Sequence, residues 1–373
     1  MNRLKVLHCI YDAPANPWLG GGGAHRVQEI YRRLTDDLDV TVAAGAYPGC
    51  RDGRRDDVPW IHLGVPRPYA LSRLSYGRAA SALVRRGAYD VAFFDFSVYT
   101  PIAVPEDRPV AHVVHMPIGP TARTRWGGLV GGVVARREAR MLGRAKRVQT
   151  TSDWMTEVLR PLVAPGAEIR VVRSGVAPAF FEVVRNEANH VLYYGRFDLF
   201  QKGLDLLLEA ARRFLTRRPG LRLVLAGRGR DEGELRRRVA APELRDRVEV
   251  RVNPDPSEVR RLMAGALCLL HPSRFEGLPV VPAEAMAAGV PVVATAVGAV
   301  TEVLGEPPGG VLVPPEDVAA LASATTSLLD DRSRRDRLSG HARESAARFS
   351  WDEVAAAHLA HARSLATAAR GDP

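Results

Sequence analysis

The sequence predicts an α/β protein made of two units, each with a parallel sheet whose strands are joined by helices. Short apolar runs that suit buried strands alternate with segments of helical periodicity, and this alternation starts twice along the chain. A length of 373 residues is also that of two ordinary domains, each able to bury its own core. In the first unit, strands are expected at Leu4–Ile10, Asp39–Ala44, Trp60–His62, Asp90–Phe94, Val110–His115 and Arg147–Thr151. Helices are expected from about Ala24 and at Tyr76–Arg86, Leu129–Leu142 and Asp153–Leu162.

The second unit restarts the alternation after a polar, irregular segment near residues 174–188. Its strands are expected at His190–Tyr194, Arg222–Ala226, Val248–Arg251, Ala266–Leu270, Val290–Ala294 and Gly310–Val313. Its helices are expected at Gly203–Arg217, Glu232–Ala240, Ser257–Met263, Pro282–Ala288 and Val318–Leu329. Two more helices follow, the last from about Ser350.

Composition is that of a soluble globular protein, with 46% apolar and 25% charged residues. The sequence has no run of ~18 apolar residues that would span a membrane. Its first residues enter a strand directly and lack the apolar core of a signal peptide. Three scattered cysteines are too few for a disulfide framework or a metal site. These features favour the reducing cytoplasm.

The net charge of +10 lies almost entirely in the first half of the chain. Residues 1–185 hold 26 Lys and Arg against 17 Asp and Glu, whereas residues 186–373 hold 26 against 25. A basic composition bias is the preferred explanation. The alternative is an anionic partner, either an anionic acceptor or the inner face of an acidic membrane. Nucleic acid is not expected, because no basic stripe with interleaved aromatic residues occurs.

The stretch 272–295 holds the clearest site. A loop, 272–279, follows an apolar strand, and ligands of open α/β sheets bind beyond the carboxyl ends of strands. Glu276 and Glu284 lie eight residues apart, with a helix N-terminus between them that would attract a phosphate. Carboxylates beside such an anion site can accept hydrogen bonds from sugar hydroxyls. The alternative is that Glu284 complements the helix dipole and that Glu276 is a solvated loop residue.

A second phosphate-binding layout lies near the N-terminus. Loop Tyr11–Gly23 follows the first strand, closes in four consecutive glycines and leads into a helix. Glycines let a backbone approach a ligand closely, and the helix N-terminus offers free amides. The loop does not match G-x-G-x-x-G, so it is a weak indication of a dinucleotide site.

Two motifs carry a resemblance to a known family. The stretch PSRFEGLPVVPAEAMAAGVPVVAT, residues 272–295, resembles the E-x7-E signature of the retaining glycosyltransferases of family 4. Upstream, GRFDLFQKG at residues 195–203 is similar to the family's G-R-x-x-x-x-K-G. The resemblance covers nearly the whole chain and is strongest over 190–317. It implies a GT-B fold, in which two Rossmann-like domains face each other across a cleft and a terminal helix crosses back to the first domain.

Under this resemblance, residues 1–180 form the acceptor domain, 181–348 the nucleotide-sugar donor domain, and 349–373 the returning helix. The implied reaction moves a hexose-type sugar from a nucleotide diphosphate sugar to an acceptor hydroxyl, with retention at the anomeric carbon. The acceptor is a small molecule, a glycan or a lipid-linked molecule. Three alternatives stay open: a phosphorylase or hydrolase, a nucleotide-sugar epimerase, and a non-catalytic sugar-binding module.

The resemblance also implies roles for single residues. Glu276 would accept from hydroxyls of the transferred sugar, and His115, at the end of an apolar run, would contact that sugar from the first domain. Arg196 and Lys202 would meet the negative charge of the leaving phosphate. No Asp-x-Asp triplet occurs, and neither a metal nor another cofactor is expected. The other expected donor-binding residues are Gly22, Gly23, Gly195, Gly277, Leu278, Pro279 and Glu284.

The helix Leu129–Leu142 has two interpretations. Its apolar residues Val130, Val133, Val134 and Met141 are expected to form the buried face of a crossover helix. The less favoured alternative is that they enter an acidic membrane beside a cluster of basic residues. That cluster is Arg136, Arg137, Arg140, Arg144, Lys146 and Arg147. The loop before the helix carries Arg123, Arg125 and Trp126, which are candidates for holding an acceptor.

Overall fold

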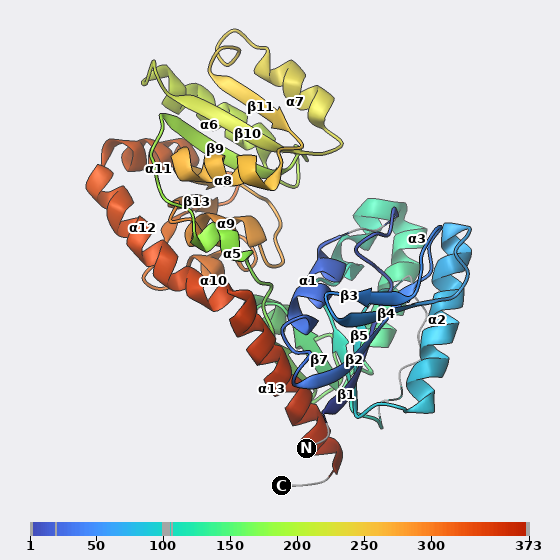
Figure 1. The fold of residues 1–373 in the computed structure, drawn as a ribbon. Coiled ribbons are helices and arrows are strands. Elements are labelled where there is room, and N and C mark those ends of the chain that lie inside the picture. Colours follow the sequence, from blue (N-terminus) through green and yellow to red (C-terminus); the bar gives the residue numbers. More distant parts are fainter. Residues whose placement is uncertain (1–2, 19–20, 99–104, 106, 371–373) are drawn as a thin grey trace. The chain divides into compact units, whose positions relative to one another are not determined.

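The computed structural model describes residues 3–18, 21–98, 105 and 107–370. The chain divides into two compact units (Figure 1). The first holds Met1–Ser174 together with Trp351–Pro373, and the second holds Gly175–Ser350. The sequence-based boundaries were placed after residues 180 and 348. The last segment therefore belongs, by its contacts, to the same unit as the N-terminus.

The first unit is built on an eight-stranded sheet. Its strands are β1 (Leu4–Ile10), β2 (Leu38–Gly45), β3 (Gly53–Arg55), β4 (Val58–Leu63), β5 (Val91–Asp95), β6 (Val110–Val113), β7 (Arg147–Thr150) and β8 (Glu168–Val171). They lie in the order β3-β4-β2-β1-β5-β6-β7-β8, and only the pair β3–β4 is antiparallel. The six predicted strands are confirmed. The fully exposed β3 has no apolar residue from which a strand could be predicted.

Helices of the first unit are α1 (Gly22–Tyr31), α2 (Tyr69–Arg86), α3 (Gly119–Leu142), α4 (Asp153–Leu159) and α13 (Trp351–Arg370). The last helix packs against α1 and β5, and Figure 1 shows it running beside them. Trp351, Val354 and Leu365 of α13 are buried in the same apolar cluster as Val27 and Ile30 of α1. The predicted return of the terminal helix to the first unit is confirmed.

Helix α3 does not bury all of the apolar residues that were predicted to form its inner face. Leu129, Val130 and Val133 are 85%, 56% and 58% exposed, so Val130 and Val133 do not form a buried face. The face that packs inward carries small residues, including Gly131 and Gly132, together with buried polar Glu138. Glu138 accepts hydrogen bonds from the backbone amides of Ile118 and Gly119. Of the predicted apolar face, Val134 and Met141 are partly buried, so the expected burial holds for only part of the helix.

The second unit has a six-stranded, fully parallel sheet. Its strands are β9 (His190–Arg196), β10 (Arg222–Arg228), β11 (Val248–Val252), β12 (Ala266–His271), β13 (Val292–Thr295) and β14 (Gly310–Val313), in the order β11-β10-β9-β12-β13-β14. Its helices are α5 (Pro178–Phe181), α6 (Leu204–Thr216), α7 (Glu232–Val239), α8 (Pro256–Gly265), α9 (Val280–Ala287), α10 (Val300–Leu304), α11 (Val318–Asp330) and α12 (Arg332–Ala346), followed by the short 3₁₀ helix η1 (Ala347–Phe349). The predicted strands and main helices are confirmed, whereas α5 and α10 are too short for the periodic pattern that predicts a helix.

Helix α9 begins two residues before its predicted start. Pro279 is the N-cap residue, so Pro282 occupies the third position, where a missing backbone N–H is still harmless. Gly289 has a φ of +71° and ends the helix as expected. Glu284 therefore lies in the second turn of α9, one turn away from the loop that carries Glu276.

Within the described residues, no helix has both the length and the apolar character needed to cross a bilayer.

Candidate functional site

A pocket of about 820 Å³ lies at the carboxyl edge of the second sheet. It is bounded by the ends of β9 and β10, by the residues after β11, and by the first turns of α9. This is the edge at which open α/β sheets bind their ligands. The residues that line it are Tyr194, Gly195, Arg196, Gly227, Arg228, Gly229, Asn253, Pro254, Val280, Val281 and Glu284.

Two arginines supply positive charge to this pocket. Arg196 ends β9 and Arg228 ends β10, directly opposite each other in the parallel register. Both residues are exposed, and neither guanidinium forms an ion pair with any residue that the structure describes. Such a pair of unneutralised charges is suited to an anionic group, because a guanidinium can donate two parallel hydrogen bonds to it.

Glu284 is the one acidic residue of the pocket lining, and it has no hydrogen-bond donor among the described residues. Burial raises the pKa of its carboxyl from the usual value to about 8. The cause is desolvation of the charged form without compensating contacts. The carboxyl is therefore largely protonated at pH 7 and faces a space where ligand hydroxyls would be its first partners.

Glu276 lies in the loop between β12 and α9 in very different surroundings. Its Oε1 accepts hydrogen bonds from Lys202 Nζ at 2.5 Å and from His271 Nε2 at 2.9 Å. The residue is only 8% exposed. Burial raises the pKa of Glu276, but the hydrogen bond and charge of His271, together with the charge and hydrogen bond of Lys202, outweigh it and bring the pKa down to about 2. The predicted pair Glu276 and Lys202 is thus brought together as an ion pair.

Two glycines hold the Glu276 loop in place by permitting close backbone approach. A Cβ on Gly203, which has a φ of +63°, would lie 1.9 Å from the carbonyl oxygen of Pro272. A Cβ on Gly298 would lie 1.8 Å from the carbonyl oxygen of Glu276 itself. Neither distance is possible for a real side chain, so both positions require glycine. The last glycine of the GRFDLFQKG motif is therefore a packing requirement of the loop.

Arg274 ties the same loop to two other segments. Its guanidinium donates to both oxygens of Asp205 at 2.8 and 2.9 Å, and to Glu316. It also lies 4.6 Å from the centre of the Phe200 ring. Arg274 precedes Glu276 by only two residues. Its contacts therefore restrict the backbone conformations available to Glu276.

In the first unit, the predicted residue His115 also pairs with a carboxylate. His115 follows β6 by two residues, and its Nε2 lies 2.9 Å from Asp95 Oδ1 at the end of the neighbouring strand β5. The other oxygen of Asp95 lies 2.6 Å from Nε2 of buried His8. His8 and His358 of α13 both contact the Tyr31 hydroxyl, at 2.8 and 3.0 Å. Burial raises the pKa of Asp95, but the two histidines lower it by more, to below its usual range.

Comparison with known proteins places this geometry in a family. Residues 20–180 match the model described as Glycosyltransferase Family 4, and residues 179–345 match the model described as Glycosyl transferases group 1. The chain belongs to glycosyltransferase family 4. The resemblance inferred from the two motifs is thereby confirmed.

Curated relatives of this transferase are themselves named as glycosyl-transferring enzymes. The MMP alpha-(1->4)-mannosyltransferase of Mycolicibacterium hassiacum is 30% identical over 319 residues, which cover 80% of this chain and 75% of that protein. Glycogen synthase of Mycobacterium tuberculosis is 30% identical over 261 residues, or 67% of this chain. The match spans 62% of the glycogen synthase, somewhat under two thirds of its length.

Solved structures confirm the predicted GT-B fold of the transferase. A sucrose-phosphate synthase from Thermosynechococcus elongatus matches with a TM-score of 0.76 at 23% identity, over 98% of this chain and 100% of that one. The Anabaena protein HepE in complex with UDP-glucose matches with a TM-score of 0.71 at 18% identity, over 97% and 100% of the two chains.

The remaining predicted residues lie in two places. Gly277 and Pro279 are buried in the Glu276 loop, and Leu278 is partly buried between them. Gly22 and Gly23 form the first turn of α1, not the preceding loop, and a Cβ on Gly22 would meet no atom within 4 Å. That turn therefore has open space beside it. The side chains of Arg123, Arg125 and Trp126 lie outside what the structure describes.

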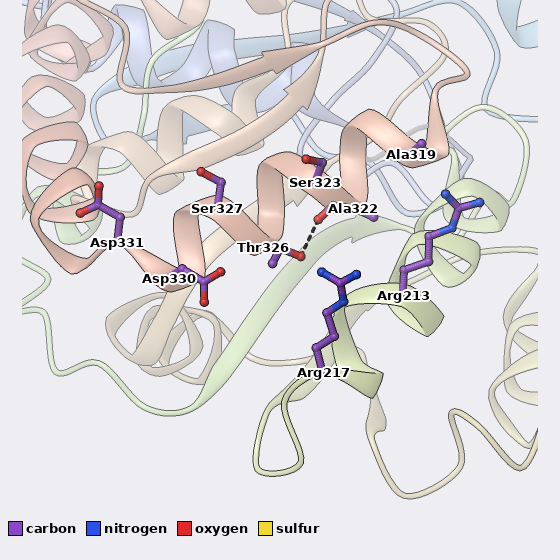
Figure 2. A pocket seen from close by; sticks show the side chains of 9 residues that line it. All are labelled: Arg213, Arg217, Ala319, Ala322, Ser323, Thr326, Ser327, Asp330 and Asp331. Carbon is purple, nitrogen blue, oxygen red and sulfur yellow. Dashed lines mark hydrogen bonds between the residues drawn. The ribbon is translucent and has the colours of Figure 1, made fainter.

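A separate hollow of about 630 Å³ lies between α6 and α11. Figure 2 shows Arg213 of α6 and Arg217, which follows that helix, on one side, with Ser323, Ser327 and Asp330 of α11 on the other. The residues that line it include none of the predicted site residues. It is a polar surface groove that shares no residue with either motif.

Sequence reasoning missed His271, Asp95 and Arg274, whereas the turn Gly227–Gly229, which the family resemblance associates with the nucleotide base, does line the pocket. His271 and Asp95 end buried strands at the carboxyl edge, which is the available signal, since side chains at that edge meet the ligand site. Arg274 carries no such signal, because its partners lie on segments far away in the sequence.

Proposed function

We propose that this transferase moves a hexose-type sugar from a nucleotide diphosphate sugar to an acceptor hydroxyl, with retention and without a metal ion. The observation that carries the proposal is the pocket with Arg196, Arg228 and the unpartnered carboxyl of Glu284. Its volume is in the range of small-ligand sites, roughly 300–1,000 Å³. Two free guanidinium groups suit the diphosphate, and a carboxyl without protein partners suits the ribose hydroxyls.

Charge develops on the leaving diphosphate as the glycosidic bond breaks. Arg196 and Lys202 are proposed to stabilise that charge, as fixed donors do when they are aimed at a developing anion. In the free protein Lys202 is neutralised by Glu276. Binding of the donor would let the ammonium turn to phosphate and make room beside Oε1 of Glu276 for a sugar hydroxyl, while His271 keeps its contact with that oxygen. The ion pair thus keeps both groups in place before the substrate arrives.

His115 of the first unit is proposed to contact the transferred sugar, and Gly22 and Gly23 to offer backbone amides to the diphosphate. Asp95 holds the Nε2 side of His115, which leaves Nδ1 for a ligand. The UDP-glucose bound by the Anabaena neighbour supports a nucleotide-sugar donor, and the names of the relatives support a sugar-containing acceptor.

The test is a panel of nucleoside diphosphates in a thermal unfolding assay, because a ligand that binds the folded state raises Tm. Product analysis with the matching nucleotide sugar, with and without acceptors, then identifies the reaction. Transfer to an acceptor supports the proposal. Formation of a sugar phosphate, release of free sugar alone, or an epimerised nucleotide sugar would replace it with one of the other enzyme classes. Activity is expected to survive EDTA, and loss with rescue by magnesium or manganese would contradict the metal-independent reaction.

We also propose that the first unit contacts an acidic membrane through α3. Leu129, Val130 and Val133 are exposed, and they are followed by the basic cluster that begins at Arg136 and Arg137. Each basic residue near an acidic surface contributes about 1 kcal/mol, screened by salt. Apolar side chains beside such a cluster can enter the interface.

Liposome sedimentation tests this contact. Salt-sensitive binding to acidic vesicles and none to neutral ones is expected. Val133→Glu should release the protein, whereas Val184→Glu, at an exposed valine of the second unit, should not. Failure to bind acidic vesicles at low salt would leave an enzyme with a soluble acceptor.

A further inference from the structure

His271 is a buried residue whose side chain contacts Glu276. It is the last residue of β12, only 3% exposed, and its Nε2 is 2.9 Å from Glu276 Oε1. Ser273 Oγ lies 3.3 Å from the same nitrogen. Because the imidazole stands on a central strand of the sheet, its position is fixed by the core rather than by the loop.

The other ring nitrogen shows which tautomer is present. Nδ1 of His271 is buried and has no hydrogen-bond partner among the described residues. A proton on Nδ1 would be a buried donor without an acceptor, which is costly. A ring with its proton on Nε2 avoids that cost and donates to Glu276. His271 therefore donates from a ring that is fixed on its strand, unlike Lys202, whose ammonium sits on a flexible side chain.

This difference matters once a diphosphate is present. Phosphate oxygens attract the ammonium of Lys202, so Glu276 stands to lose one of its two donors. The imidazole of His271 is buried on its strand and cannot follow the phosphate. Burial without a donor raises the pKa of a carboxyl, as it does for Glu284, so Glu276 needs a donor that stays in place.

We propose that His271 is a positioning residue that keeps Glu276 ionised and oriented while Lys202 engages the donor's phosphate. The inference rests on the proposed function, since it assigns Glu276 to the transferred sugar. His271 itself touches neither the sugar nor the phosphate. Its effect is on turnover and on the acid limb of the pH profile, not on nucleotide binding.

The experiment compares His271→Gln, His271→Asn and His271→Leu. The glutamine amide nitrogen reaches the place of Nε2 and can donate to Glu276, whereas the asparagine amide ends near Nδ1 and cannot. The Gln variant should keep kcat within about threefold. The Asn and Leu variants should lose about 10- to 100-fold in kcat, the range for a lost hydrogen bond to a charged group. The Kd for free nucleoside diphosphate should stay within about twofold, because Glu276 is not proposed to hold the nucleotide.

The pH profile supplies the readout that a merely structural role would not move. Loss of the His271 donor raises the pKa of Glu276, so the acid limb of kcat should move to higher pH in the Asn and Leu variants. His190→Leu is the matched control, since it removes a partly buried histidine whose Nε2 contacts the Leu262 carbonyl. The control should lower Tm without moving the acid limb.

Equal kcat and equal acid limbs in the Gln and Asn variants would overturn the inference, and this contrast decides it even where His271→Leu does not fold. Glu276→Gln, measured in parallel, tests the proposed role of Glu276 separately from the positioning role of His271. Wild-type turnover in Glu276→Gln would remove the proposed role of Glu276. An impaired Glu276→Gln beside an unaffected His271→Asn would overturn the positioning role alone.

Discussion

Glu276 and Glu284 lie eight residues apart on one loop and helix, yet their surroundings are opposite. Glu276 is buried with two donors, and its pKa is lowered to about 2. Glu284 lines the pocket with no donor, and burial raises its pKa to about 8. The sequence spacing predicts that two carboxyl groups serve one ligand, but the groups around each carboxyl decide which of them is charged.

At pH 7 one of the two is therefore a fixed anion and the other mostly a neutral acid. The anion has its partners before substrate arrives, as suits a group that must be oriented at the reacting sugar. Glu284 has no such donors among the residues that the structure describes, so its charge depends on the donors that the ligand supplies. The comparison predicts that Glu276 governs turnover and that Glu284 governs nucleotide affinity in a pH-dependent way.

The largest loss of kcat is expected when a positively charged residue of the site is removed. Arg196→Ala and Lys202→Ala should each lower kcat by on the order of 10²-fold or more, because each removes a fixed charge from the developing phosphate anion. Lys202→Ala should also raise the pKa of Glu276 and move the acid limb of kcat upward, whereas Arg196→Ala should leave the limb in place. Steady-state kinetics from pH 5 to 9 measures both. Wild-type turnover together with wild-type nucleotide affinity in both variants would reject the donor site.

The two glutamates are separated directly by amide substitution. Glu276→Gln should lower kcat by about 10²-fold while free nucleoside diphosphate still binds, since an amide cannot replace an anion that is held for the transition state. Glu284→Gln should leave kcat at saturating donor nearly unchanged and weaken nucleotide binding. Calorimetric Kd values beside kcat decide between them. Equal losses of nucleotide affinity in both variants would erase the distinction.

Most residues of this site could be predicted from the sequence, because they lie in short segments with recognisable patterns. The Glu276 loop, helix α9 and Arg196 with Lys202 each lie within a short, patterned segment, and the structure places them as an ion pair and a pocket lining. His271 and Asp95 were not predicted, since a lone polar residue at the end of a strand is equally well a packed one. The contacts of Asp95 come from other strands, and the contact of His271 depends on how the loop after its own strand turns back to it.

The exposed apolar residues of α3 and the requirement for glycine at position 298 show the same limit of sequence-based prediction. Gly298 is required because the Glu276 carbonyl approaches it from a loop 22 residues away, which no local pattern records. In α3, Leu129, Val130 and Val133 are exposed, whereas the polar Glu138 is buried and accepts from the backbone amides of Ile118 and Gly119. Local chemistry predicts which residues can serve a site, and the packing of distant segments decides which ones do.

The pH dependence of nucleotide binding sharpens the comparison further. Ribose hydroxyls donate to the anionic form of Glu284, so binding lowers the raised pKa and releases a proton. Affinity should therefore rise as pH increases toward about 8 and level off above it, by up to about tenfold per pH unit below the free-state pKa. Glu284→Gln should abolish the slope above pH 7. Pyrophosphate, which lacks the ribose, is the control ligand and should show no such slope with the wild-type protein.

A third carboxylate, Asp95, extends the comparison to the first unit with the smallest expected effect. Like Glu276 it is buried with two donors, here His115 and His8, which hold its pKa below the usual range. Asp95→Asn removes the charge that orients His115 and should lower kcat by roughly 10-fold, the scale of one hydrogen bond to a charged group. Asp90→Asn is the matched control, because Asp90 lies just before the same strand and accepts from the Lys5 amide instead. If the two variants lose turnover equally, the loss reflects stability alone. A loss confined to Asp95→Asn would show that two histidine donors serve one carboxylate in the first unit as His271 and Lys202 serve Glu276 in the second.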